Sequence, residues 1–263
     1  MTNDARPALT TTTPAIDLMR SHRSVREFAD RPVGDDAIEA MVEAALGASS
    51  HQGLFAWTVV AVRDAERKAA LQQVTGASAF IADAPVLLVW VADMSRIAQA
   101  GVDAGSGAPT GLDYIEPYTI AVTDTTMAAE NATVAAESLG LGICYIGGLR
   151  RNIGAVAELL GLPEHSFALF GMTVGYPADE APAPADLKPR PPLAGVLFAE
   201  QYDNAAAAAG VAEIEQTIPA YYARAGRPGF SWRANAVRAM DAQNLMNGTG
   251  NRADLEQRGF AAR

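Results

Sequence analysis

This sequence of 263 residues is poor in the side chains that build disulfides and metal sites. It has one cysteine, Cys144, and three histidines, His22, His51 and His165, which are far apart in the chain. A single cysteine excludes an internal disulfide and a zinc site built from cysteines, and the histidines lack metal-binding spacings such as H-x-x-x-H. We therefore expect a protein without a bound metal.

Long apolar runs are also missing. No stretch reaches the roughly 18 consecutive apolar residues of a membrane-spanning helix, and MTNDARPALTTTTPA at the start has no apolar segment typical of a secretory signal. The formal net charge of −10 disfavours nucleic acid and anionic membrane surfaces as partners. We expect a cytoplasmic protein that binds neither.

Lysine is scarce, and most of the positive charge comes from arginine. The only lysines are Lys68 and Lys188. Lys68 lies among charged residues in a predicted helix, DAERKAALQQVTG, and we expect it to be solvated. Lys188 lies in DLKPRPP, where Pro189 fixes the backbone and holds Lys188 and Arg190 at a set spacing. This segment is either an ordinary surface loop or a rigid pair of cations for an anionic ligand.

The stretch SHRSVREF at residues 21–28 places a histidine and two arginines after a predicted helix, TPAIDLMR, in which Thr13 is the expected N-cap and Pro14 the first helical residue. In an extended segment Ser24 and Arg26 point to one side and Val25 to the other. Arginine forms strong charge-assisted hydrogen bonds with phosphate. The segment is therefore either a phosphate site or a surface turn in which Arg26 pairs with nearby carboxylates.

The pattern of apolar residues predicts about four strands and five or more helices in uneven alternation, which is typical of an α+β layered domain. The apolar run VLLVWVA predicts a central strand covered on both faces. Residues 99–112, which are rich in glycine, are expected to form a loop. The dinucleotide fingerprint G-x-G-x-x-G is absent, because Tyr145 occupies the third glycine position in GLGICYIGG. The predicted strands are residues 57–62, 86–92, 143–147 and 167–177, and the predicted helices include 14–20, 34–48, 64–76, 121–140 and 150–161.

The apolar strand around Cys144 ends in two glycines, Gly147 and Gly148. Glycines at a strand end allow backbone N–H groups to approach a planar ligand, although a simple tight turn has the same pattern. We expect Cys144 to be a buried, unreactive thiol rather than a nucleophile, since burial raises the pKa of a thiol.

Four segments in this order resemble the nitroreductase family of flavoproteins. SHRSVREF resembles the family's entry motif, AAESLGLGICYIGGLRRNI its long helix and Y-I-G-G strand end, and FGMTVGYP and DLKPRPP its next strand and Lys-Pro-Arg loop. The layout is most similar to the branch of oxygen-insensitive NADPH nitroreductases and flavin reductases, and it covers residues 13 to about 200.

The resemblance implies a three-layer α/β/α fold with a mostly antiparallel central sheet and a C-terminal arm. It also implies an obligate homodimer with its active sites at the subunit interface. We expect a disordered tail at 1–12, an FMN-binding domain at 13–200 and a C-terminal arm or lid at 201–263.

The resemblance also implies the residues that bind FMN. Lys188 is expected to stabilise charge at the N1 and C2-carbonyl edge of the flavin, and Ser78 stands where this branch commonly has a flavin-facing glutamine. Phe55 and Trp57 are expected on the acceptor side, while Arg224 and Arg227 could meet the 2′-phosphate of NADPH. The full set of expected FMN contacts is His22, Arg23, Ser24, Arg26, Ser50, Ser78, Tyr145, Gly147, Gly148, Lys188 and Arg190.

The function implied is an FMN-dependent oxidoreductase that takes two electrons from NADPH or NADH and passes them, in ping-pong order, to a nitroaromatic or a quinone. No catalytic acid or base is required. The alternatives are a specialised reductase, acting on free flavin, an enone or a halogenated substrate, and a flavin-binding protein without turnover.

Overall fold

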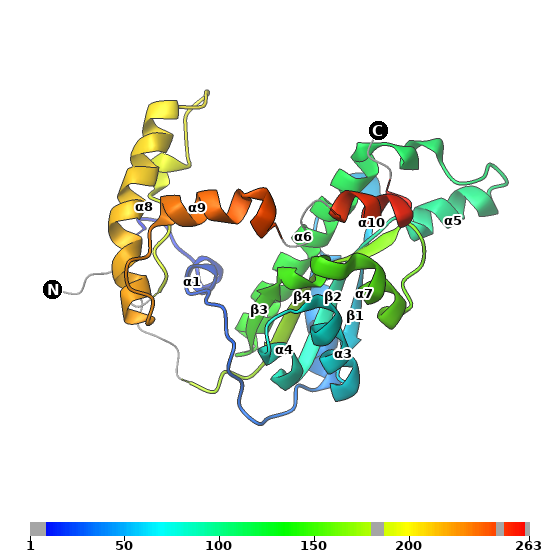
Figure 1. Cartoon of the computed structure of the whole chain (residues 1–263), viewed down its shortest axis with the longest axis horizontal. Coiled ribbons are helices and arrows are strands. Elements are labelled where there is room, and N and C mark those ends of the chain that lie inside the picture. The colour runs from blue at the N-terminus through cyan, green and yellow to red at the C-terminus, as the bar shows by residue number, and fades with distance from the viewer. Residues whose placement is uncertain (1–8, 180–186, 246–249, 261–263) are drawn as a thin grey trace. The chain divides into compact units, whose positions relative to one another are not determined.

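The computed structural model describes residues 9–179, 187–245 and 250–260. These form two compact units, which are described separately (Figure 1). The sheet unit lies within Ser24–Asp179 and Met246–Arg263, and the helical unit lies within Met1–Arg23 and Glu180–Leu245. Most of the tail expected at 1–12 lies outside the described residues.

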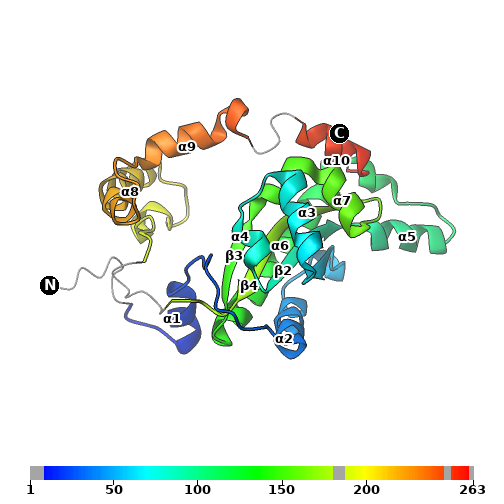
Figure 2. The same cartoon turned by 60° about the horizontal axis from the view of Figure 1, so that its bottom comes forward.

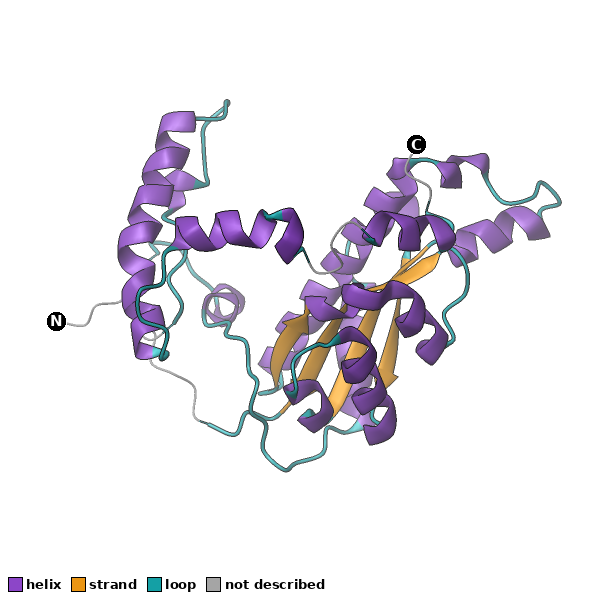
Figure 3. Cartoon of the chain, in the orientation of Figure 1, coloured by secondary structure: helices purple, strands orange, loops and turns teal. Residues whose placement is uncertain are grey.

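The centre of the sheet unit is a four-stranded antiparallel sheet in the order β1-β2-β4-β3 (Figure 3). All eight residues of β2 are buried, because β1 and β4 flank the strand and helices cover both faces. This confirms the predicted central strand. The strands are β1 (Trp57–Val62), β2 (Val86–Asp93), β3 (Gly142–Ile146) and β4 (Ser166–Gly175).

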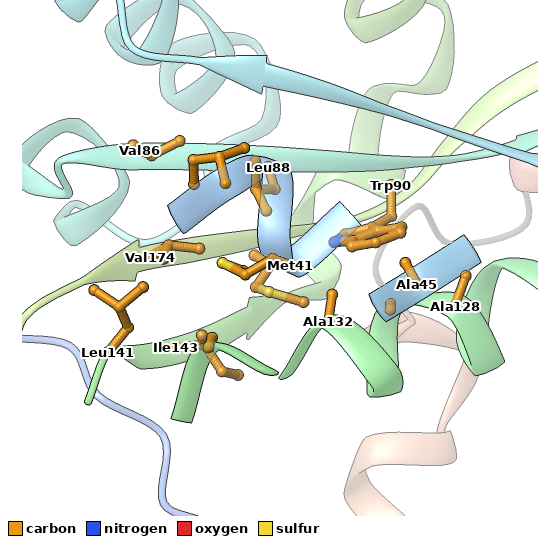
Figure 4. Packing of buried hydrophobic residues seen from close by; sticks show 14 of the residues in the cluster. Met41, Ala45, Val86, Leu88, Trp90, Ala128, Ala132, Leu141, Ile143 and Val174 are labelled. Atoms are coloured by element: carbon orange, nitrogen blue, oxygen red, sulfur yellow. The ribbon is translucent and has the colours of Figure 1, made fainter. Parts of the chain in front are cut away.

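One face of the sheet is covered by α2 (Asp35–Leu46) and the long helix α6 (Ile115–Ser138). Small side chains on α6, among them Ala128 and Ala132, are fully buried and let the helix approach the strands closely. Figure 4 shows Met41 of α2 within this cluster, between the strands and α6. The helix predicted at residues 121–140 therefore forms most of α6 and packs in this core.

The opposite face carries α3 (Ala65–Thr75), α4 (Phe80–Asp83) and α7 (Ile153–Leu160) (Figures 1 and 2). The alternation of side chains along β2 divides the two cores: Leu87 packs with these helices and Leu88 with α2 and α6. The predicted three-layer α/β/α arrangement with an antiparallel sheet is confirmed.

Two expectations about local structure are wrong. Part of the predicted loop 99–112 is helical, in α5 (Ser95–Asp103) and the short η2 (Thr110–Asp113). Gly101 is tolerated inside α5 because the chain folds back there, and a Cβ would collide with the Gly107 carbonyl oxygen. Gly101 suggests a loop in the sequence, but in the structure it allows α5 to lie close to the backbone at Gly107.

The second correction concerns Lys68, which was expected to be solvated. Its exposed fraction is only 5%. Its ammonium donates a hydrogen bond to the Ala84 carbonyl, at the end of α4. Burial lowers the pKa of Lys68, against a smaller opposing effect of Asp83 and Asp64. The charged residues of α3 suggest that Lys68 faces the solvent, but α4 covers it.

The end of the chain belongs to the sheet unit. After α10 (Asn251–Gln257), the Arg258 guanidinium donates to the carbonyls of Leu162, Pro163 and Ser166. Phe260 is buried, with its ring 5.1 Å from that of Phe167. The expected arm or lid at 201–263 stays a prediction. Of its described residues, 250–260 belong to the sheet unit.

The helical unit consists of short and long helices. Helix α1 (Pro14–Arg20) starts with the expected cap, in which Thr13 accepts a hydrogen bond from the Ile16 N–H. The apolar segment after DLKPRPP contains the 3₁₀ turn η5 (Leu193–Gly195), followed by α8 (Asn204–Arg224), α9 (Trp232–Met240) and η6 (Ala242–Asn244). None of the helices in the described ranges has the length and apolar character needed to cross a membrane.

Candidate functional site

A pocket of about 320 Å³ lies where β3 ends in the sheet unit. It collects five of the residues predicted to contact a flavin, although these come from three separate segments of the chain. Its lining comprises Arg26, Gly76, Ala77, Ser78, Phe80, Cys144, Tyr145, Ile146, Gly147, Gly148 and Arg151.

The segment with the arginines reaches the pocket because it runs beside β3. The Val25 N–H donates to the Ile143 carbonyl over 2.8 Å, and Ser24 forms a parallel bridge with Ile143. The Val25 side chain is buried against Gly142, where an added Cβ would lie 2.7 Å from the Val25 Cβ. Ser24 and Arg26 are exposed on the other side, so the predicted alternation is confirmed.

Arg26 forms no ion pair within the part of the chain that the structure describes. Its guanidinium donates only a long hydrogen bond, 3.4 Å, to the Ser24 carbonyl. The alternative in which nearby carboxylates neutralise Arg26 is therefore not what the described residues show. The charge remains available at the wall of the pocket.

Cys144 also lines the pocket, in an environment that disfavours the thiolate form. Burial raises the pKa of the Cys144 thiol, and this effect exceeds the opposing influences of the Arg26 charge and a hydrogen bond with Ser24. The thiol is buried, as the sequence predicts.

The two glycines open the short helix η3 (Gly147–Asn152) directly after β3. A Cβ on Gly148 would lie 3.0 Å from the Cβ of Ala77, which is tighter than most contacts of this kind. Glycine therefore lets the strand end lie close to the 76–78 loop that carries Ser78. The wall of the pocket is largely backbone at this point.

Tyr145 lines the pocket, and its side chain is held by contacts with α6 and β4. Its hydroxyl lies 2.8 Å from the Thr133 hydroxyl on α6, and its ring packs edge-on against Phe170. Burial strongly raises the pKa of Tyr145. Because successive side chains of β3 alternate between faces, this ring lies on the α6 side of the sheet while Cys144 lies on the other.

Ser50 belongs to a second group of hydrogen-bonded residues in the sheet unit, centred on Asp124. The Ser50 hydroxyl donates to Asp124 over 2.7 Å and accepts a hydrogen bond from the Phe55 N–H, also over 2.7 Å. Asp124 accepts two further bonds, from the N–H groups of His51 (3.0 Å) and Ala56 (3.2 Å). The exposed fraction of Asp124 is only 1%, so this carboxylate anchors the 50–56 loop from within the core.

The sequence analysis missed Asp124. The predicted helix around Asp124 also contains Glu130 and Glu137, so an acidic residue there was no specific signal. The anchored loop contains the short helix η1 (His51–Gly53) and has unusual backbone angles, with φ of 49° at Gln52 and 47° at Phe55. Non-glycine residues rarely adopt positive φ, so the hydrogen bonds to Asp124 and Ser50 hold a strained loop.

The two aromatic residues of this loop have different positions. The exposed fraction of Phe55 is 43%, which agrees with a surface that a ligand can reach. Trp57 is only 6% exposed, and its ring centre lies 5.6 Å from that of Trp90. Trp57 is the first residue of β1 and is buried in the core, and its expected place on the acceptor side stays a prediction.

The remaining predicted residues belong to the helical unit. His22 and Arg23 are half-buried, whereas Lys188, Arg190, Arg224 and Arg227 are exposed. Lys188 and Arg227 both contact the ring of Tyr222, at 5.4 and 4.9 Å from its centre. Among the described residues, no group of three or more histidine, cysteine, aspartate or glutamate side chains is arranged to hold a metal ion.

Comparison with known proteins identifies the family of this chain. The nitroreductase family matches residues 19–176, and the C-terminal domain of the nitroreductase family matches residues 188–263. The chain belongs to the nitroreductase family. This confirms the resemblance found in the four sequence segments.

Relatives in the nitroreductase family have related activities. Over 189 residues the chain is 42% identical to an oxygen-insensitive NADPH nitroreductase of Salmonella typhimurium, which covers 72% of this chain and 75% of the relative. It is 34% identical over 188 residues to an FMN reductase (NADPH) of Bacillus subtilis, which covers 72% and 74%. A solved structure of the NADPH:FMN oxidoreductase of Vibrio harveyi, complexed with NAD⁺, has a TM-score of 0.80 and 33% identity and covers 95% of this chain and 100% of that one.

Proposed function

We propose that this nitroreductase-family chain is an FMN-dependent NAD(P)H oxidoreductase that transfers two electrons by a ping-pong mechanism. The observation that carries the proposal is the pocket at the end of β3, which brings together Arg26, Ser78 and the backbone of residues 145–148. The resemblance to nitroreductases assigns residues of all three segments to the flavin. The names of the relatives support NADPH as the donor and FMN as the cofactor.

The residues present fit a flavin mononucleotide. A volume of about 320 Å³ lies within the usual range of ligand pockets. Arg26, which forms no ion pair among the described residues, suits the phosphate. The strand end at Gly148, where a Cβ would press on Ala77, offers a flat backbone wall for a planar ring.

When bound, FMN supplies the redox chemistry by accepting hydride and passing on two electrons. The protein's contribution is to bind the cofactor and to place charge. Lys188 supplies positive charge for the N1 and C2-carbonyl edge of the ring, with Arg190, His22, Arg23, Ser24 and Ser50 as further cofactor contacts. Arg224 and Arg227 are the candidates for the 2′-phosphate of NADPH, and Phe55 is the candidate for the acceptor side.

The proposed acceptors are nitroaromatics and quinones. Free flavin is the second candidate, since the Bacillus subtilis relative is named an FMN reductase. The net charge of −10 makes anionic polymers and membranes poor partners. We propose a cytoplasmic homodimer acting on small molecules.

The first experiment is the visible spectrum of the purified protein, recorded anaerobically before and after NADPH or NADH. A flavin spectrum that is bleached by either nucleotide and restored by a nitroarene or a quinone supports the proposal. A flavin that neither nucleotide reduces contradicts turnover with these donors and leaves a flavin-binding protein. Absence of flavin after incubation with FMN contradicts the cofactor assignment.

A matched pair of variants tests the pocket itself. Arg26→Gln removes the cation from the pocket wall, and we expect FMN to bind at least about tenfold more weakly, since a hydrogen bond to a charged group contributes about 1.5–3 kcal/mol. Arg67→Gln removes an exposed cation from α3 and serves as the control. Equal FMN affinities of the two variants in a fluorescence titration would contradict the phosphate role of Arg26.

A further inference from the structure

The helical unit contains a cluster of two cations, Lys188 and Arg227, and two aromatic rings, Tyr222 and Phe230, of which only the rings have no assigned role. Phe230 stacks on Tyr222 with ring centres 3.8 Å apart and an interplanar angle of 25°. The Arg227 guanidinium carbon lies 4.9 Å from the centre of the Tyr222 ring and 5.5 Å from that of Phe230. The Lys188 ammonium lies 5.4 Å from the Tyr222 ring, although Lys188 comes from a distant part of the chain.

Hydrogen bonds hold both ends of the turn between α8 and α9, which carries Arg227 and Phe230. After α8, the Arg227 N–H donates to the Tyr222 carbonyl over 2.7 Å. Gly226 and Gly229 adopt positive φ of 74° and 78°, which turns the chain back so that Phe230 meets Tyr222. Beyond the turn, the Arg233 N–H donates to Glu215 of α8 over 2.9 Å.

Neither cation is neutralised within the residues that the structure describes. Lys188 and Arg227 are exposed, and neither forms an ion pair there. An aromatic ring attracts a cation through the partial negative charge of its face, and the cation keeps its full charge. A carboxylate, in contrast, would neutralise the cation. Tyr222 therefore orients two like charges and leaves both available for anionic groups.

We propose that Tyr222 is a positioning residue that holds Lys188 for the flavin and Arg227 for the 2′-phosphate of the donor, and so favours NADPH over NADH. This rests on the proposed function, in which Lys188 and Arg227 have these two roles. Tyr222 touches neither ligand in the proposal. It acts by restricting both side chains, because a flexible cation loses more freedom on binding than one that is already held.

The proposal predicts that one substitution weakens two separate binding events. In Tyr222→Leu we expect adenosine 2′,5′-bisphosphate to bind about three- to tenfold more weakly, as expected for the loss of one cation–π contact, while 5′-AMP is unaffected. FMN should also bind a few-fold more weakly, because Lys188 loses the same ring. Tyr222→Phe retains the ring and should restore both affinities.

The experiment is isothermal titration calorimetry of the FMN-loaded protein with the two nucleotides, together with a fluorescence titration of the apoprotein with FMN. Tyr221→Leu, in the adjacent position of α8, is the control for packing alone, since the Tyr221 ring lies edge-on to Tyr222 at 5.3 Å but no described cation contacts it. Tyr222→Met keeps an apolar contact with Phe230 and replaces Tyr222→Leu if that variant does not fold. Steady-state KM values for NADPH and NADH provide a further readout, in which only the KM for NADPH should rise.

The outcomes separate this inference from the proposed function. Unchanged discrimination between the two nucleotides in Tyr222→Leu overturns the inference, and so does a Tyr222→Phe variant as impaired as Tyr222→Leu. A wild-type protein that binds FMN and is reduced by NADH, but binds both nucleotides equally, overturns the inference and leaves the function intact. A wild-type protein that binds no FMN overturns both.

Discussion

Asp124 is the residue that fastens the 50–56 loop to α6. Its carboxylate accepts hydrogen bonds from Ser50, His51 and Ala56 while being almost fully buried. A buried carboxylate is costly unless such partners are present, so the loop and the carboxylate depend on each other.

We expect Asp124→Asn to lower the free energy of unfolding by about 2–4 kcal/mol, because the amide turns an acceptor into a donor that faces N–H and O–H groups. Urea denaturation measures the change. Asp113→Asn, at an exposed position, is the control and should change it by less than about 0.5 kcal/mol. A loss below about 1 kcal/mol in Asp124→Asn would contradict the anchoring role.

Cys144 provides a prediction about pH. Burial raises the pKa of its thiol in the folded state, so little thiolate exists at pH 8. We expect reaction with a disulfide reagent to be at least about a hundredfold slower in the native protein than in urea. Because the folded protein holds the thiol proton more tightly, the contribution of Cys144 to the free energy of unfolding is fully present below the pKa of the unfolded chain. This contribution is lost as the pH rises through the pKa of the folded protein. A native rate equal to the unfolded one, both measured with the apoprotein, would contradict the burial.

At the scale of elements, two helical glycines have opposite predicted effects. Gly210 lies within α8, and an added Cβ would lie 2.8 Å from the Cα of Gly195 near η5. Gly154 lies within α7, with no atom within 4 Å of an added Cβ. Helix propensity favours alanine at both positions by about 1 kcal/mol, so the difference between them comes from packing.

We therefore expect Gly154→Ala to raise the free energy of unfolding by about 0.5–1 kcal/mol. Gly210→Ala should lower it by about 1–3 kcal/mol, because backbone of the 193–195 turn must move away from the helix. Chemical denaturation of the two variants, followed by helical circular dichroism, tests the pair. Stabilisation by both substitutions would show that the approach of η5 to α8 is not tight.

At the scale of the whole molecule, the helical unit exposes more apolar surface than a monomer needs. Six large apolar side chains there are 61–74% exposed. Exposed apolar surface of this kind commonly marks an interface, and the proposed homodimer would cover it with a second copy of the chain. The residues are Leu193, Val196, Leu197, Tyr202, Val237 and Met240.

We expect the wild-type protein to sediment as a dimer and Leu197→Glu to shift the equilibrium towards monomer by at least about tenfold, because a charge would be buried in an apolar contact. Analytical ultracentrifugation over a range of protein concentrations measures this. Val102→Glu places a charge at an exposed apolar position of α5 in the sheet unit and is the control. A dimer equally stable in both variants would contradict a role of the 193–197 segment in the interface.

The sequence by itself determined the features that depend on neighbouring residues. The apolar run of β2, the Thr13–Pro14 helix start and the alternation of Val25 with Arg26 were all predicted, because strand period and capping are local properties. The ordered segments that resemble nitroreductases also identified the family.

Only the tertiary structure decided which surfaces are covered. Trp57 packs against Trp90 because β1 and β2 pair at that point, and Lys68 is buried because the end of α4 covers it. Asp124 gained its role from a loop that lies about seventy residues earlier in the chain. Periodicity tells which side chains share a face, but what packs against that face depends on contacts between distant segments, and no local pattern contains them.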